Sequence, residues 1–103
     1  MLDPSYHDRY AAKRLEDPEF RAEYERQRRV IGAIDAIVDR LDALRVERGY
    51  TKADLARAIG KNPASVRRLL TAKGNPELAT VVAIADALES EVVVVRKSAR
   101  RRA

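Results

Sequence analysis

The stretch TKADLARAIGKNPASVRRLL, Thr51–Leu70, decides the fold of this 103-residue chain. It holds two short segments with helical spacing of apolar residues, and a glycine separates them. Two short helices that cross steeply need a small residue at the crossing, a turn residue that tolerates positive φ, and an aliphatic anchor in the second helix. These three places are filled by Ala56, Gly60 and Val66. The stretch therefore predicts a helix-turn-helix unit.

The second helix of this unit is expected over residues 63–71, with Asn62 as its cap. A helix presents one face to the core and leaves the other open. The residues expected to face the core are Val66, Leu69 and Leu70. The residues expected to face outward are Ala64, Ser65, Arg67 and Arg68.

Positive charge is concentrated around this unit, although the whole chain carries a net charge of only +5. Residues 52–73 contain six basic side chains and one acidic side chain, and residues 96–103 add five basic side chains and no acidic one. Residues 1–30 hold equal numbers of each sign. This distribution indicates a polyanionic partner such as nucleic acid, and the plain alternative is a solvated basic face.

Several short motifs predict where helices begin. An Asx side chain caps the first turn and a proline fits the first helical position, and this pairing occurs at Asp3-Pro4, Asp17-Pro18, Asn62-Pro63 and Asn75-Pro76. Thr51, with Asp54 three residues later, resembles a capping box and predicts a fifth start.

The remaining segments predict one long helix and one strand. A single apolar stripe with helical spacing is formed by Ile31, Ile34, Val38, Leu41 and Leu44. The segment EVVVV, Glu91–Val95, is rich in β-branched residues and predicts a short strand. A lone strand is not stable, so it would pair with a second copy, with a partner or with another strand.

The first thirty residues differ from the rest because four of the five aromatic residues of the chain lie there. One or two amphipathic helices are expected, over about 4–15 and 18–29, the second either ending there or continuing into the next helix. The aromatic pairs are spaced i, i+4 and therefore share helix faces: Tyr6 with Tyr10, and Phe20 with Tyr24. They either pack against the following helix or form a surface that binds a partner protein.

Residues 31–95 resemble the phage-repressor-like (Xre/Cro) helix-turn-helix superfamily. The segments LLTAKGNPELATVVAIADALESEVVV and LEDPEFRAEYERQRR are similar to HigA-type antitoxins of type II toxin–antitoxin systems. The resemblance implies an all-α protein with a five-helix domain over 31–95, an N-terminal helical arm over 1–30, a short C-terminal β-strand and a basic tail over 96–103.

The resemblance also implies how DNA would be bound, with the helix over 63–71 in the major groove. Arg68 is then the strongest candidate for a bidentate contact with guanine. Ala64 and Ser65 could touch base edges, and Arg67 could contact either a base or a phosphate. Phosphate contacts are expected from Lys52, Lys61, Asn62 and Lys73. Lys52 and Lys61 replace the glutamine and the aliphatic residue common in the family, which favours phosphate contact over base recognition at both positions.

The function implied is that of a DNA-binding antitoxin, a homodimer that represses its own operon on double-stranded operator DNA. Its arm would hold a RelE/ParE-like (HigB-type) toxin through Tyr6, Tyr10, Phe20 and Tyr24. Two alternatives are a stand-alone repressor without a toxin and a structural adaptor that uses the same fold.

Other classes of protein are not indicated. The chain has no cysteine and one histidine, His7, so no thiolate metal site, nucleophile–base pair or cofactor is expected, and we predict no enzymatic activity. No apolar run approaches the roughly 18 residues of a membrane span, and no signal pattern opens the chain. A cytoplasmic location is therefore expected.

Overall fold

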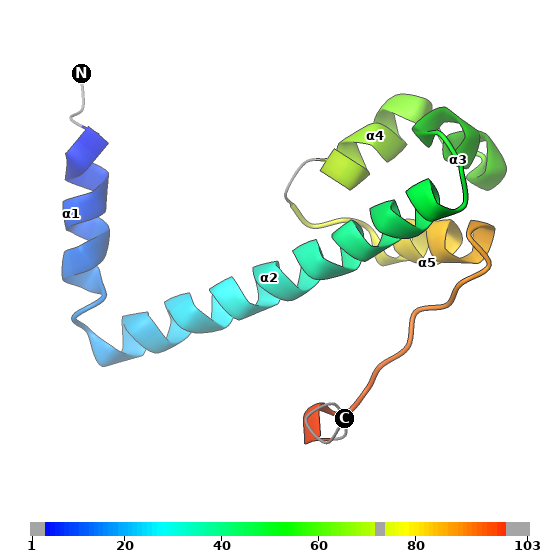
Figure 1. The fold of residues 1–103 in the computed structure, drawn as a ribbon. Helices are drawn as coiled ribbons and strands as arrows, with labels where there is room; N and C mark the ends of the chain where they lie inside the picture. Colours follow the sequence, from blue (N-terminus) through cyan, green and yellow to red (C-terminus); the bar gives the residue numbers. More distant parts are fainter. Residues whose placement is uncertain (1–3, 72–73, 99–103) are drawn as a thin grey trace. The chain divides into compact units, whose positions relative to one another are not determined.

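In the computed structural model, which describes residues 4–71 and 74–98 and side chains from residue 8 onward, the chain forms five α-helices (Figure 1). They are α1 (Pro4–Arg14), α2 (Pro18–Glu47), α3 (Lys52–Ile59), α4 (Pro63–Thr71) and α5 (Leu78–Ala87). The chain divides into two compact units, Met1–Asp35 and Ala36–Ala103. The second expected arm helix continues without a break into the following helix, and together they make α2.

Local capping chemistry sets most of the helix starts, as the sequence predicts. The Asp17 Oδ1 atom accepts a hydrogen bond from the Glu19 amide at 3.0 Å, at the start of α2. The Asn62 Oδ1 atom accepts one from the Ala64 amide at 2.7 Å, at the start of α4. Helix α1 also begins at a proline, Pro4.

The start expected at Asn75-Pro76 is wrong. Helix α5 begins at Leu78, and Glu77 occupies the cap position without a side-chain hydrogen bond. The backbone of Glu77 is extended, with ψ of 128°, so the helix cannot begin before the next residue. Asn75 and Pro76 therefore belong to the connection between α4 and α5.

Three helices end in the same way, with a residue in the left-handed region. This residue is Gly49 after α2, Gly60 after α3 and Glu89 after α5. At Gly60 the residue's own amide donates to the Arg57 carbonyl at 3.2 Å, and the Lys61 amide donates to the Ala56 carbonyl at 2.9 Å. This pair of bonds satisfies carbonyls that a helix end otherwise leaves open, and it turns the chain sharply.

Replacing Gly60 by alanine is expected to lower the free energy of unfolding by about 1–2 kcal/mol, because an L side chain is disfavoured in the left-handed region. Space is not the cause, since an added Cβ atom would meet nothing within 4 Å. The matched control is Gly32→Ala inside α2, where the added Cβ is equally unobstructed. There alanine should stabilise the helix by about 0.5–1 kcal/mol. Urea unfolding of both variants measures the difference, and equal effects would contradict the role of Gly60.

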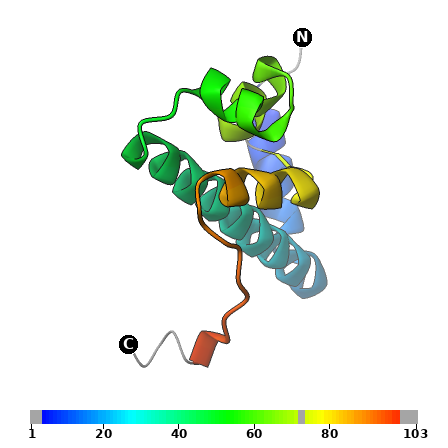
Figure 2. The same ribbon diagram turned by 90° about the vertical axis from the view of Figure 1, so that its right-hand side faces the viewer.

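The core of the Ala36–Ala103 unit lies among α3, α4, α5 and the C-terminal part of α2 (Figures 1 and 2). Its buried residues are all apolar: Val38, Leu41, Leu55, Ala56, Val66, Leu70, Val81, Ile84, Ala85 and Leu88. The predicted small residue at the crossing and the predicted anchor of the second helix are both in this set. Leu69 is partly buried and packs against it, so the predicted core face of α4 is confirmed.

The apolar stripe predicted along the long helix reaches the core only over part of its length. Val38 and Leu41 are buried, and Leu44 packs against the core. Ile31, on the same stripe, is 50% exposed. The spacing correctly gave the face of the helix, but that face is covered only toward the C-terminal end of α2.

The strand expected at Glu91–Val95 is not formed, and no strand occurs anywhere in residues 4–71 and 74–98. The segment has no regular secondary structure, and its four valines are exposed. A strand requires backbone hydrogen bonds to a second strand, and the described chain offers none. Among the helices the structure describes, none is long and apolar enough to cross a membrane.

Candidate nucleic-acid interface

Helix α3 begins with a complete capping box, as expected from Thr51 and Asp54. The Thr51 Oγ1 atom accepts from the Asp54 amide at 3.0 Å, and the Asp54 Oδ2 atom accepts from the Thr51 amide at 3.0 Å. Hydrogen bonds from the Thr51 backbone and side chain lower the pKa of Asp54, and the charge of Arg57 adds to the effect. The carboxylate therefore stays ionised at neutral pH and remains bound to the cap.

Arg57 is held by this same carboxylate, with which its guanidinium forms an ion pair within α3. Two other arginines of the unit are also paired: Arg45 lies 2.8 Å from Asp42, and Arg48 lies 3.0 Å from Glu89. These three arginines have acidic neighbours, which distinguishes them from the arginines of α4.

Helix α4 rests on the core through its back face and leaves its front face open. Val66 and Leu70 on the back face are 1% and 6% exposed. Ala64 and Ser65, in the first turn, are exposed and small. The N-terminal end of α4 therefore has a small cross-section, and the groove of a nucleic acid could approach its backbone closely.

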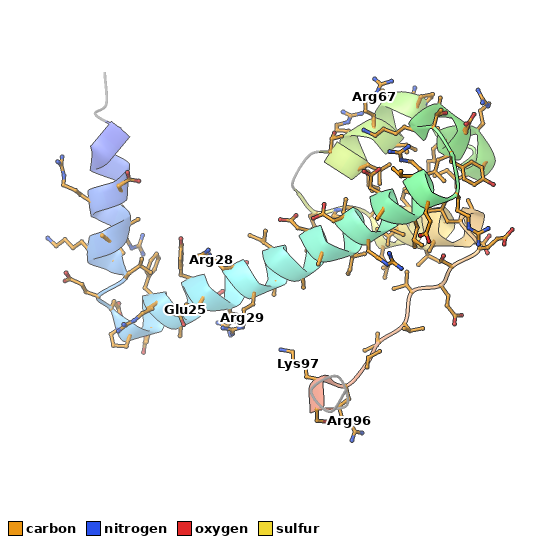
Figure 3. All side chains as sticks on the ribbon, viewed as in Figure 1. Glu25, Arg28, Arg29, Arg67, Arg96 and Lys97 are labelled. Atoms are coloured by element: carbon orange, nitrogen blue, oxygen red, sulfur yellow. The ribbon has the colours of Figure 1, made fainter. Side chains whose placement is uncertain are left out.

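Arg67 and Arg68 stand on the open face of α4. Both side chains are exposed, and neither guanidinium makes an ion pair or a hydrogen bond with any part of the chain that the structure describes. Figure 3 shows Arg67 extending away from α4 into solvent. Two adjacent arginines without acidic neighbours are free to bind a ligand with hydrogen-bond acceptors in one plane, such as a base edge or a phosphate.

Other predicted contact residues lie around this face or next to it. Lys61 and Asn62 are exposed in the turn before α4, and Lys52 is half-buried at the start of α3. The structure thus places six predicted residues on α4 and the turn before it, and one at the neighbouring helix start. Lys73 lies outside the described residues.

The Met1–Asp35 unit brings together three of the four predicted aromatic residues. The guanidinium of Arg14 lies 4.3 Å from the centre of the Phe20 ring and 5.6 Å from that of Tyr10. The rings of Phe20 and Tyr24 stack with their centres 6.4 Å apart. An arginine that lies over the face of an aromatic ring is attracted to it electrostatically. These contacts hold Tyr10, Phe20 and Tyr24 together with Arg14, and we call this group the aromatic cluster.

The aromatic cluster is not a hydrophobic core. Tyr10 and Tyr24 are exposed, Phe20 is only half-buried, and no residue from 8 to 35 is buried. Tyr6 belongs to α1, but its side chain lies outside the described part. Within the described residues, no group of histidines, cysteines and carboxylates is arranged to hold a metal ion.

Comparison with known protein families gives one match. A family model described as Helix-turn-helix matches residues 41–94. The match begins near the C-terminal end of α2, includes α3, α4 and α5, and ends in the segment after them. No curated protein and no solved structure matches the chain.

Proposed function

The chain belongs to the Xre/Cro-like helix-turn-helix family of DNA-binding regulators, and from this premise we propose that it is a transcriptional repressor that recognises a specific operator through α4. The observation that supports this proposal is the open face of α4. It combines an N-terminal end of small cross-section with Arg67 and Arg68, which no described acidic group neutralises.

Each residue of this face has a distinct role in the proposal. Arg68 makes a bidentate contact with O6 and N7 of a guanine in the major groove, and Arg67 contacts an adjacent base or a phosphate. Ala64 and Ser65 lie against base edges, where a thymine methyl group suits a small side chain.

Phosphate contacts surround this face in the proposal. Lys52, Lys61 and Lys73 supply positive charge. Asn62 already uses its side-chain oxygen to cap α4, so only its amide NH₂ group is left to donate to a phosphate. These contacts hold the helix in place without reading sequence.

We expect two copies to bind together, each reading one half-site. Helix-turn-helix repressors of this kind bind half-sites about one helical turn of DNA apart. The domain assignment that accompanies this proposal is an arm over 1–30, a DNA-binding domain over 31–95 and a basic tail over 96–103.

The direct test measures binding of the full chain to the DNA upstream of its own gene over a range of salt concentrations. Affinity should fall steeply as salt rises, because bound lysines and arginines release counterions from DNA. Lys61→Ala should weaken binding to specific and unrelated DNA alike, and reduce the salt dependence by about one phosphate contact. Arg40→Ala, which removes an equal charge from an exposed position on α2, is the control. Affinity that does not change with salt would exclude the phosphate contacts.

A finer function is supported by the aromatic cluster of the N-terminal unit. We infer that Tyr6, Tyr10, Phe20 and Tyr24 bind a RelE/ParE-like (HigB-type) toxin, and that the protein is an antitoxin that represses the operon of the pair. Exposed aromatic residues beside arginines are typical anchors of protein interfaces. The alternative is a stand-alone repressor, whose arm would have no such partner.

Co-expression with the product of the neighbouring gene separates the two functions. The antitoxin should co-purify with a small basic protein encoded there, and Phe20→Ala with Tyr24→Ala should weaken that complex by about tenfold or more. Leu78→Ala, at an exposed apolar position of α5, is the matched control and should change nothing. The stand-alone repressor is favoured if no neighbouring product is retained by the wild-type chain.

A further inference from the structure

The N-terminal half of α2 is a long stretch of helix in which no residue before Val38 is buried. Helix α2 runs from Pro18 to Glu47, but its buried residues are only Val38 and Leu41. Helices in water obtain most of their stability from packing of an apolar face, and short unpacked helices are marginal. A partner helix packed against the residues before Val38 would supply the apolar packing that this part of α2 lacks in the single chain.

The apolar face of this half has the spacing of a coiled coil. The residues Tyr24, Gln27, Ile31, Ile34, Val38 and Leu41 alternate at intervals of three and four. These are the a and d positions of a heptad repeat, which form the seam between two supercoiled helices. Val38 and Leu41 are buried in the core of their own unit, whereas Ile31 and the neighbouring Val30 are half exposed.

The charges beside the seam favour a second copy of α2 in parallel orientation. In this heptad, Glu23 occupies a g position and Arg28 the following e position. Parallel helices in register place each g residue beside the e′ residue five positions further along the other helix. Glu23 then faces Arg28 of the second copy, and the symmetry of the pair makes this contact twice.

An antiparallel arrangement is disfavoured by the same charges. An antiparallel pair with Gln27 opposite Ile31 of the second copy would bring the exposed seam residues together. The same pair would place Arg28 against Arg28 of that copy. The register that pairs Ile31 with Ile34 instead requires Val38 and Leu41 at the interface, and both are already buried. Figure 3 shows Arg28 and Arg29 leaving α2 on different sides, so only one of these arginines can flank the seam.

We propose that residues 27–34 of α2 form a parallel coiled coil with the same segment of a second copy, with Gln27, Ile31 and Ile34 in the seam and Tyr24 left in the aromatic cluster. This inference rests on the homodimer of the proposed function and names its surface. In the single chain, Glu23 is held by Gln27 Nε2 at 2.9 Å and by Arg26, both exposed contacts within α2. Exposed contacts of this kind contribute little to stability. When two copies pair, Glu23 exchanges them for the contact with Arg28 of the second copy.

Cysteine cross-linking tests the arrangement directly, because the chain has no cysteine of its own. Under mild oxidation, Gln27→Cys should give a covalent dimer on a non-reducing gel, since identical seam residues face each other in a parallel pair in register. Ala22→Cys, at an outward position of the same helix, should stay uncross-linked. A Gln27→Cys chain that remains single, or a dimer formed equally by both variants, overturns the proposal.

Mass measurement by light scattering, without DNA, gives a second test. The wild-type chain should have the mass of two chains at concentrations of tens of micromolar, and Ile31→Asp the mass of one chain at the same concentrations. Val46→Asp, at an exposed apolar position of α2 outside the seam, should keep the mass of two chains. A wild-type mass of one chain, or of three or more chains, overturns the proposal.

A charge exchange tests the orientation. Glu23→Arg alone should weaken the dimer at least tenfold, and the double variant Glu23→Arg with Arg28→Glu should restore it. Failure of the double variant to recover overturns the parallel register. Arg68→Ala should keep the mass of two chains while it weakens DNA binding, so a failure of DNA recognition can be told apart from a failure of the seam.

Discussion

Replacing Leu55 by alanine is expected to lower the free energy of unfolding by about 2–5 kcal/mol. The side chain is 0% exposed and lies in the core formed by α3, α4, α5 and the end of α2. Its removal loses buried apolar surface and leaves a cavity among elements that cannot all move inward. Small domains have about 5–15 kcal/mol of stability in total, so the variant loses a large share of it.

Chemical denaturation monitored by circular dichroism measures this loss. The matched control is Leu78→Ala, the same substitution at a leucine of α5 that is largely exposed, where a change within about 0.5 kcal/mol is expected. DNA binding of Leu55→Ala should disappear at the temperature at which the variant unfolds, and return on cooling. A similar loss of stability in both variants would contradict the core assigned here.

Replacing Arg68 by alanine should weaken binding to the operator by roughly 5- to 150-fold, which corresponds to the loss of about 1–3 kcal/mol from one bidentate contact with guanine. Binding to unrelated DNA should change much less, because only a single positive charge is removed. The side chain is exposed and its guanidinium makes no ion pair or hydrogen bond with a described residue, so the fold should remain intact.

A gel shift with operator and scrambled DNA separates base recognition from phosphate contact. Arg40→Ala controls for the loss of charge, and Arg67→Ala shows whether the neighbouring arginine contributes to sequence recognition. Equal losses on both DNAs for Arg68→Ala would assign that side chain to the phosphate backbone. Unchanged affinity for the operator would remove Arg68 from the interface.

The features that could be predicted from the sequence are those controlled by nearby residues. Gly60 terminates α3 because the conformation it adopts is disfavoured for other residues, and Asn62 starts α4 with a bond to an amide two positions away. Val66 is buried in the core, as its helical spacing from Gly60 predicts. Local chemistry was therefore sufficient for the helix-turn-helix unit and for the exposure of Arg67 and Arg68.

The features that the sequence mispredicts rest on composition, a short motif or spacing, none of which fixes the structure alone. Val92–Val95 has the composition of a strand, but composition cannot supply the second strand that the hydrogen bonds require. The Asn75-Pro76 motif suits a helix start, yet α5 begins only at Leu78, after an extended Glu77. The spacing of Ile31 and Val38 identifies one helix face, but only the tertiary structure shows where its cover ends.

Helices α2, α3 and α5 each end with a residue in the left-handed region, and this shared feature affects how quickly the Ala36–Ala103 unit folds. At Gly49, Gly60 and Glu89 the closing hydrogen bonds span at most five residues, so each turn depends only on contacts that are local in the sequence. Domains built from such local contacts fold in roughly microseconds to milliseconds, because little chain entropy is lost before the contacts form. The pairing of Arg48 with Glu89 joins residues 41 positions apart. Because this contact links the ends of α2 and α5, we expect it to form only once these two helices meet.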